Sequence, residues 1–261
     1  MVEHSNREEA LALLRKGCRN AEVARRLGVP VGTIGWWKHR DLAERNALPG
    51  RKRSTCPHCY GDPLDGAAYT YLLGLYLGDG HIIQPRQHRA PNLAITCDDS
   101  WPGLQDAAEQ AMRQVLPNNT PCRVRRTGCH DVKVYSKHLP CYFPQHGPGK
   151  KHERAIALEP WQQQLVDAHP WGLVRGLIHS DGCRITNWAT RTVNGVTRRH
   201  GYPRYFFTNT SGDIRRIFTD TLDALGVEWK ASLPRPRGQV NVSVARRASV
   251  ALLDEHVGAK W

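Results

Sequence analysis

Two stretches of the chain repeat one pattern, and they decide the fold: Leu72-Leu73-Gly74-Leu75-Tyr76-Leu77-Gly78-Asp79-Gly80 and Val174-Arg175-Gly176-Leu177-Ile178-His179-Ser180-Asp181-Gly182. Each is an apolar helical stretch that ends in Asp-Gly. Small residues stand four positions apart in both, and residues at that spacing share one helix face where two backbones can approach closely. The pattern predicts two helices packed face to face, with Asp79 and Asp181 side by side at one end.

Paired carboxylates at adjacent helix ends suit a divalent metal and phosphodiester chemistry. The alternative is a pair of core helices that merely finish in Asp-Gly, which is a common helix stop. The motif recurs after about a hundred residues, which is the length of half a domain. Such a repeat indicates two copies of one structural unit and favours the functional interpretation over chance.

Composition points to a polyanionic partner. The chain has 261 residues, 40% of them hydrophobic, and a net charge of +13 that is spread along its length. This charge is typical of nucleic-acid binders, because phosphate contacts supply much of their affinity. A basic protein without such a partner is the alternative.

The sequence shows no sign of membrane insertion or export. No run approaches the roughly 18 apolar residues that would span a bilayer. Residues 1–9 are polar and acidic, unlike a signal peptide. The eight cysteines are scattered, and we expect mostly reduced thiols and a cytoplasmic location.

Residues 1–46 are expected to form a small all-α module. Helical patterns cover 7–16, 21–27 and 31–39, and Gly28-Val29-Pro30 makes the turn between the last two. This arrangement resembles a helix-turn-helix of bacterial regulators and recombinases. A protein-binding helical bundle is the alternative. In the DNA-binding interpretation, the contacts come from Thr33, Trp36, Lys38 and Arg40.

Residues 47–67 are expected to be a linker. Its basic tripeptide, Arg51-Lys52-Arg53, could follow a phosphate backbone. The Cys-Pro-His-Cys segment that follows is half of a zinc knuckle, with Cys56 and Cys59 as possible Zn²⁺ ligands. The remaining ligands would have to come from distant positions such as Cys141, His138 or His146. A turn with two incidental thiols is the alternative.

Residues 68–160 and 161–261 are expected to be two halves with the same element order, α-β-β-α-β-β-α. Each half starts with one Asp-Gly motif. The predicted fold class is α+β.

On these residues, the chain resembles the LAGLIDADG homing endonuclease family in its single-chain, two-motif form, over about residues 68–261. The resemblance implies two pseudo-symmetric halves whose antiparallel sheets form a saddle over double-stranded DNA. It also implies Mg²⁺ held by the motif carboxylates between the scissile phosphates, and a monomer with an internal pseudo-twofold axis.

The resemblance also implies roles for single positions. Asp79 and Asp181 match the acidic residue of the motif and would hold Mg²⁺. A basic residue near the phosphates would be Lys150 or Lys151 in the first half and Lys260 in the second. The polar residue at the end of the second strand would be Asp98 in the first half and Asn209 in the second.

Strand side chains two residues apart lie on one sheet face and can reach base edges in a major groove. The expected DNA contacts of the sheets are Arg123, Arg125, Lys133, Arg184, Lys230 and Asn241. A basic hairpin tip adds Arg198 and Arg199. Ordinary solvent exposure of these side chains is the alternative.

The sequence is compatible with three functions. The first is a site-specific double-stranded DNA endonuclease that hydrolyses phosphodiester bonds with Mg²⁺, with the helix-turn-helix extending recognition. The second is a non-catalytic transcriptional regulator on the same scaffold. The third is an RNA-binding or RNA-processing protein.

Overall fold

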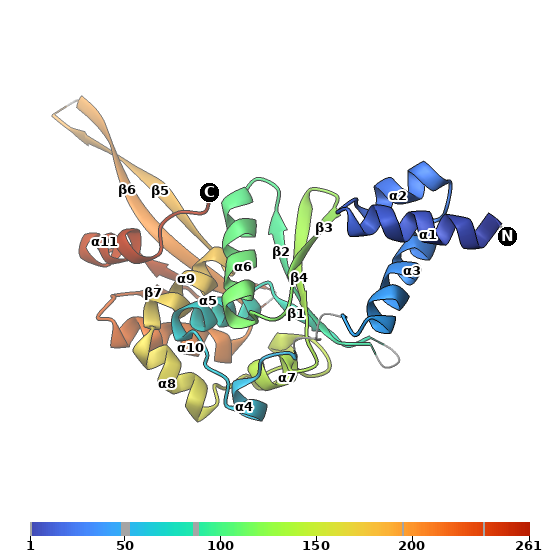
Figure 1. Ribbon diagram of the computed structural model, residues 1–261. Coiled ribbons are helices and arrows are strands. Elements are labelled where there is room, and N and C mark those ends of the chain that lie inside the picture. Colours follow the sequence, from blue (N-terminus) through green and yellow to red (C-terminus); the bar gives the residue numbers. More distant parts are fainter. Residues whose placement is uncertain (1, 48–52, 86–88, 195, 237) are drawn as a thin grey trace. The chain divides into compact units, whose positions relative to one another are not determined.

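The computed structural model describes residues 2–47, 53–85, 89–194, 196–236 and 238–261 (Figure 1). The chain divides into two compact units, one ending at Lys52 and one running from Arg53 to Trp261. Arg51 and Lys52, which we expected to contact phosphates, lie outside the described residues. Among the described helices, none is long and apolar enough to cross a membrane.

The N-terminal unit contains helices α1 (Val2–Arg15), α2 (Asn20–Leu27) and α3 (Val31–Glu44). Gly28 ends α2 with φ 62°, a left-handed conformation that favours glycine. The three helices share a small core made of Ala10, Val23, Ala24, Ile34 and Trp37. The third helix extends to Glu44, beyond the expected end at residue 39. A three-helix unit with its own core fits the helix-turn-helix interpretation, which remains a prediction.

The second unit repeats one order of elements twice, as the sequence predicted. The first repeat comprises α5 (Gly66–Leu77), β1 (His81–Ile83), β2 (Asn92–Asp98), α6 (Pro102–Val115), β3 (Cys122–Arg126), β4 (Cys129–Tyr135) and α7 (Leu139–Tyr142). The second comprises α9 (Pro170–Asp181), β5 (Gly182–Val193), β6 (Val196–Asn209), α10 (Gly212–Ala224), β7 (Lys230–Ala231), β8 (Val240–Val244) and α11 (Arg247–His256). Short helix α4 (Pro57–Tyr60) precedes the first repeat, and α8 (Pro160–Ala168) joins the two.

Each repeat forms a four-stranded antiparallel sheet with the same topology. The strand orders are β1-β2-β4-β3 and β5-β6-β8-β7. Figure 1 shows α6 alongside the strands of the first sheet, and the β5–β6 hairpin extending as a long two-stranded arm near α11. The predicted α+β class with two pseudo-symmetric sheets is confirmed.

Helices α5 and α9 pack against each other between the two sheets (Figure 1). A Cβ added to Gly74 would lie 2.8 Å from the Gly176 Cα, and one added to Gly176 would lie 2.8 Å from the Gly74 Cα. The backbones therefore touch, and the predicted face-to-face packing is what the structure has. Because α5 is buried on all sides, it carries no polar stripe, and every residue from Ala68 to Leu77 is buried.

Local sequence sets where these helices begin. The Asp65 carboxylate accepts a hydrogen bond from the Ala68 amide at 3.0 Å and caps α5. Pro170 stands in the first turn of α9, where its missing N–H costs nothing. Both repeats contribute to one hydrophobic core, which runs from Ala68 to Val257.

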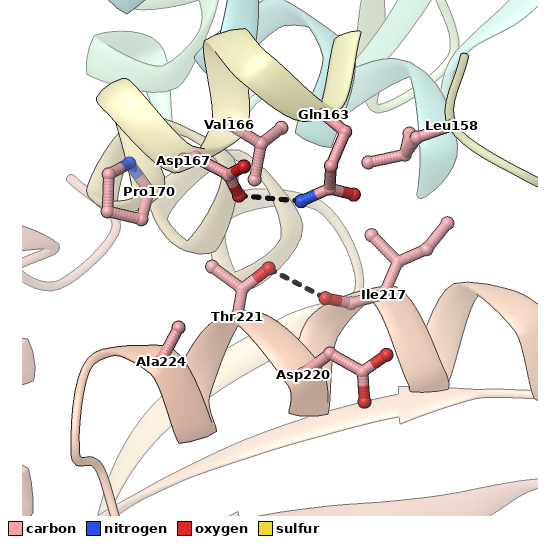
Figure 2. Close-up of a pocket in the computed structure, with 9 residues that line it drawn as sticks. All are labelled: Leu158, Gln163, Val166, Asp167, Pro170, Ile217, Asp220, Thr221 and Ala224. Carbon is pink, nitrogen blue, oxygen red and sulfur yellow. Dashed lines mark hydrogen bonds between the residues drawn. The ribbon is translucent and has the colours of Figure 1, made fainter. Parts of the chain in front are cut away.

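A cavity between α8 and α10 is lined by Leu158, Gln163, Val166, Asp167, Pro170, Ile217, Asp220, Thr221 and Ala224 (Figure 2). In the wall of this cavity, the Gln163 amide donates to the Asp167 carboxylate at 2.7 Å. None of the described residues that line it is basic, and two are carboxylates. Its charge is therefore opposite to what a phosphodiester substrate requires.

Candidate metal and nucleic-acid site

The two motif carboxylates lie together at the ends of α5 and α9. Gly78 follows α5 directly and leads into Asp79, while Asp181 is the last residue of α9. A Cβ on Gly78 would lie 1.9 Å from the Ser180 Oγ and 3.4 Å from the Asp181 Oδ2. The helix ends therefore touch, and only glycine fits at position 78.

Loss of solvent contact raises the pKa of both carboxyl groups, and for Asp181 the charge of Asp79 adds to the rise. Burial, followed by the charge of Asp79, raises the pKa of Asp181 to about 6. Burial also raises the pKa of Asp79, while the charges of Lys260 and Lys151 oppose that rise. Asp79 is exposed and Asp181 is half-buried, and two carboxylates held this close together favour either a shared proton or a cation. The two carboxylates and their closeness therefore fit a divalent ion that prefers oxygen ligands.

The side chain of Asn209 orients one of the two carboxylates. Asn209 ends β6, and its amide donates to the Asp181 Oδ2 at 2.6 Å. This bond stabilises the ionised form and lowers the pKa of Asp181 against the larger effect of burial. The family resemblance had placed Asn209 at this position.

The equivalent residue in the first half is Cys97 rather than Asp98. His81 and Cys183 each stand two residues after the motif aspartate, and they pair with Ala94 and Phe206. Ala94 is therefore the counterpart of Phe206, and three residues further along each strand Cys97 is the counterpart of Asn209. Cys97 is buried, and burial together with the charge of Asp79 raises the pKa of its thiol to about 12. The expectation for Asp98 is corrected: Asp98 is exposed and accepts from the Ser100 amide at 2.7 Å in a turn.

Lys151 closes the C-terminal end of α5. Its ammonium group donates to the backbone carbonyls of Tyr76, Gly78 and Gly80. These acceptors use all three of its N–H groups. Burial lowers the pKa of Lys151 to about 8, and the charges of Asp181 and Asp79 oppose that fall. Lys151 therefore fixes the backbone that presents Asp79. Its positive charge also stabilises the C-terminal end of α5, where the helix dipole is negative.

Lys260 occupies the matching position on α9 with fewer bonds. It donates to the Ser180 carbonyl at 2.9 Å, and burial lowers its pKa while Asp79 opposes the change. The neighbouring Trp261 fixes this segment: its carbonyl accepts from the Gly103 amide at 2.9 Å. A Cβ on Gly103 would overlap the Trp261 indole at 1.8 Å. The sequence did not predict this contact, because no pattern in it links Gly103 with Trp261.

A groove lies beside Asp181, lined in part by Lys150, Lys151, His152, Thr208 and Asn209. The Lys150 side chain is 73% exposed and approaches Glu153 at 3.6 Å. Of the two lysines considered for the first half, Lys150 is thus the exposed one and Lys151 the half-buried one.

Strand register corrects the expected faces of two arginines. Arg123 lies opposite Val132, on the face covered by α6, and its guanidinium binds Asp106 and Glu109 of that helix at 2.6 and 2.7 Å. Arg184 binds Asp254 of α11 at 2.6 and 2.9 Å. Both side chains are held on the helix side of their sheets, so neither lies on the open face. Arg125 shares the face of Arg123 and is exposed.

The open faces carry a repeated polar pair. In the first sheet, Thr96 donates to Asp131 at 2.8 Å, and Lys133 lies 3.1 Å from the same carboxyl group. In the second sheet, Thr208 donates to Asn241 at the equivalent place. Lys230 lies beside this pair and is exposed.

Two open-face arginines were not found from the sequence. Arg126 lies 2.5 Å from Asp131 in the first sheet. Arg204 places its guanidinium 5.0 Å from the ring centre of Tyr202 and 5.7 Å from that of Phe206 in the second. Strand spacing alone could not identify them, because it does not say which face a helix covers.

The β5–β6 arm carries the remaining sheet arginines. Arg199 stacks on Trp188 at 4.1 Å, and Trp188 is 55% exposed. Arg198, which directly precedes Arg199, is also exposed. Arg53, by contrast, is held locally, since it forms two hydrogen bonds of 2.6 Å to Asp62 and stacks on Tyr60 at 4.4 Å.

In the N-terminal unit, the four expected contacts all lie on α3. Trp36 and Lys38 are exposed, and Thr33 is half-buried. The Arg40 guanidinium lies 5.4 Å from the Trp36 ring and donates to Glu44 at 3.1 Å. The surface of α3 thus offers an aromatic and two basic side chains.

Comparison with known proteins identifies the fold. No family model matches the sequence, and no characterised protein matches it at the level of sequence. Among solved structures, the chain is similar to a single-site variant of I-DmoI in complex with its target DNA in the presence of Mg, with a TM-score of 0.51 and 16% identity over 74% of this chain and 96% of that chain. The chain has a LAGLIDADG fold.

Two further solved structures match with lower TM-scores. One is I-DmoI in complex with DNA and Mn, with a TM-score of 0.49 and 16% identity over 74% of this chain and 97% of that chain. The other is the N-terminal LAGLIDADG domain of DUF199/WhiA, with a TM-score of 0.46 and 9% identity over 76% of this chain and 87% of that chain. The resemblance inferred from the two Asp-Gly motifs is confirmed at the level of the LAGLIDADG fold.

Proposed function

We propose that this protein is a site-specific endonuclease for double-stranded DNA, which hydrolyses phosphodiester bonds with a divalent metal ion, Mg²⁺ in the cell. One observation carries the proposal: two carboxylates, the exposed Asp79 and the half-buried Asp181, lie together at the ends of two helices packed through glycine. The basic composition of the chain supports a polyanionic substrate.

The carboxylate pair fits the metal that this activity requires. Burial and the neighbouring charge hold the pKa of Asp181 at about 6, so the pair is electrostatically unfavourable when both groups are ionised. A divalent cation bound by the two carboxylates would relieve that repulsion. Asp79 and Asp181 would hold it, and it would supply charge neutralisation at the phosphodiester and activation of water.

The chain's own side chains prepare the site. Asn209 fixes the orientation of the Asp181 carboxylate through its 2.6 Å hydrogen bond. Lys151 fixes the backbone before and after Asp79. Lys260 donates one of its three N–H groups to the Ser180 carbonyl. Its other N–H groups and its positive charge would be available to a phosphate oxygen. The exposed Lys150 provides a further cation in the groove beside Asp181.

DNA recognition is assigned to the open faces of the two sheets. Their side chains, including Lys133, Lys230, Asn241 and Arg204, would contact base edges and phosphates in the major groove. The β5–β6 arm, with Arg198 and Arg199, would extend the contact along the backbone. Helix α3 of the N-terminal unit would add a second, helix-turn-helix mode of recognition. The two internal repeats supply both halves of the site, so the protein would act as a monomer.

The test is a selection from a DNA library. Purified protein is incubated with a randomised library in Mg²⁺ or in EDTA, and both cut and bound molecules are sequenced. The proposal predicts cutting at one long site in Mg²⁺ and binding of that same site in EDTA. Selective binding without cutting in Mg²⁺ or Mn²⁺ would instead identify a DNA-binding regulator, and would overturn the assignment of an enzyme.

A further inference from the structure

We infer that the second unit contains a structural zinc site formed by Cys56, Cys59, His138 and Cys141. It is separate from the proposed nuclease site and does not depend on that function. One ligand atom from each of the four side chains lies within 4.8 Å of those of the other three. The Cys59 and Cys141 sulfurs are 3.7 Å apart, although 82 residues separate them in the sequence.

These distances match tetrahedral coordination. Zinc–sulfur bonds of about 2.3 Å place two sulfurs of a tetrahedral site about 3.8 Å apart. The observed 3.7 Å between the Cys59 and Cys141 sulfurs is that separation, and it is well beyond a disulfide bond of about 2.05 Å. Three thiols and one imidazole are a ligand set typical of structural zinc.

The local backbone supports the same assignment. The Cys59 amide donates to the Cys56 sulfur at 3.3 Å, which orients that sulfur and stabilises negative charge on it. The Cys56 amide donates to the Asp62 carboxylate at 2.9 Å, and Asp62 is fixed in turn by Arg53. Cys56 is fully buried. Such outer contacts orient metal ligands and are characteristic of built sites.

The identity of the ligands favours zinc over Mg²⁺. Mg²⁺ prefers oxygen donors, whereas thiolates with one imidazole select zinc. Four protein ligands leave no open position, so this ion would be structural. It would link the start of the second unit, at α4, to α7 of the first repeat. The Tyr142 hydroxyl, which donates to the Thr55 carbonyl at 3.0 Å, joins the same two segments.

The test measures metal content and its dependence on single ligands. Full-length protein is purified without chelator, and bound metals are quantified by plasma mass spectrometry. We expect about one zinc per chain. Cys141→Ser and His138→Asn should each lower zinc content at least tenfold after dialysis against a mild chelator. Two matched controls, Cys122→Ser and His58→Asn, should retain it, because these exposed side chains lie outside the cluster.

Cobalt substitution keeps the test decisive if a ligand variant fails to fold. Wild-type protein refolded with Co²⁺ should show the intense visible bands of a tetrahedral ion and a sulfur-to-cobalt charge-transfer band, and zinc should displace both. Absence of stoichiometric metal, a Cys59–Cys141 disulfide in freshly purified protein, iron in place of zinc, or zinc retained equally in Cys141→Ser and Cys122→Ser would each overturn the assignment.

Discussion

Gly74 and Gly176 oppose each other across the central helix pair, and neither position has room for a methyl group. A Cβ on Gly74 would lie 2.6 Å from the Leu173 carbonyl oxygen, and one on Gly176 would lie 2.3 Å from the Tyr71 carbonyl oxygen. The obstructing atoms are backbone, so no rotamer change relieves them. This contact sets the separation of the helices and, through it, the separation of Asp79 and Asp181.

Gly74→Ala and Gly176→Ala should each destabilise the second unit. Overpacking of this kind costs about 1–3 kcal/mol, and backbone obstruction favours the upper end. Urea unfolding, followed by tryptophan fluorescence, measures the loss. Gly212→Ala is the control, because a Cβ there would come no closer than 3.8 Å to another side chain. Equal stability of Gly74→Ala and Gly212→Ala would contradict the packing.

Asn209→Ala should weaken metal use without unfolding the protein. Asn209 donates to the Asp181 carboxylate, and loss of such an outer contact typically lowers metal affinity or activity by about 10–100-fold. The measurement is the Mg²⁺ concentration for half-maximal cleavage. Asp98→Ala is the control, since Asp98 caps an exposed turn and should leave that concentration unchanged. The reverse ranking of the two variants would restore Asp98 as the site residue.

Stability should depend on pH when metal is absent. The pKa of Asp181 is raised to about 6 in the folded state, above its ordinary value. A carboxyl group shifted upward stabilises the fold at low pH, and that contribution is lost as the pH rises through 6. In EDTA, the free energy of unfolding should therefore fall by about 2 kcal/mol between about pH 4 and pH 7.

The pH dependence is measured against a matched variant. Asp181→Asn removes the titrating group, so the difference in unfolding free energy between wild type and variant isolates this carboxyl pair. Mg²⁺ should restore stability to the wild type near neutral pH and leave the variant unchanged. A difference between the two proteins that stays constant from pH 4 to pH 7 would show that the pair is not held as described.

The two half-buried lysines, Lys151 and Lys260, should differ when replaced. Lys151→Met removes three hydrogen bonds to the carbonyls around Asp79, so it should lower the unfolding midpoint as well as cleavage. Lys260→Met removes one such bond, so it should reduce cleavage with a smaller effect on the midpoint. Thermal unfolding and single-turnover cleavage on the same preparations compare them. Equal loss of stability in both variants would contradict these separate roles.

The sequence predicted the central helix pair because its evidence is local and repeated. Two apolar helical stretches with small residues four apart and a final Asp-Gly specify both the packing face and the ends that meet. The order of strands and helices followed from the same repeat. The two halves of the LAGLIDADG fold could therefore be predicted from the sequence alone.

The errors arose where three-dimensional register decides. Asp98 and Cys97 are adjacent, and only strand pairing shows that Cys97 takes the place of Asn209. Arg123 and Arg184 stand at strand positions of the right parity for a face, but parity cannot say which face a helix covers. The approach of Cys59 to Cys141 is not one of these errors: the sequence named Cys141 and His138 among three distant candidates, and only tertiary structure could select them.

Single-turnover cleavage of the selected DNA site by wild type, Asp79→Asn and Asp181→Asn, with DNA affinity measured in parallel, tests the role of the paired carboxylates most directly. Asparagine keeps the shape of each side chain and removes its charge, so the helix pair should stay folded. We predict that both variants bind DNA as the wild type does and cleave at least about 100-fold more slowly, because removal of a group that stabilises the transition state costs roughly 10²–10³ in rate. Wild-type cleavage rates in either variant would contradict a catalytic role for the pair.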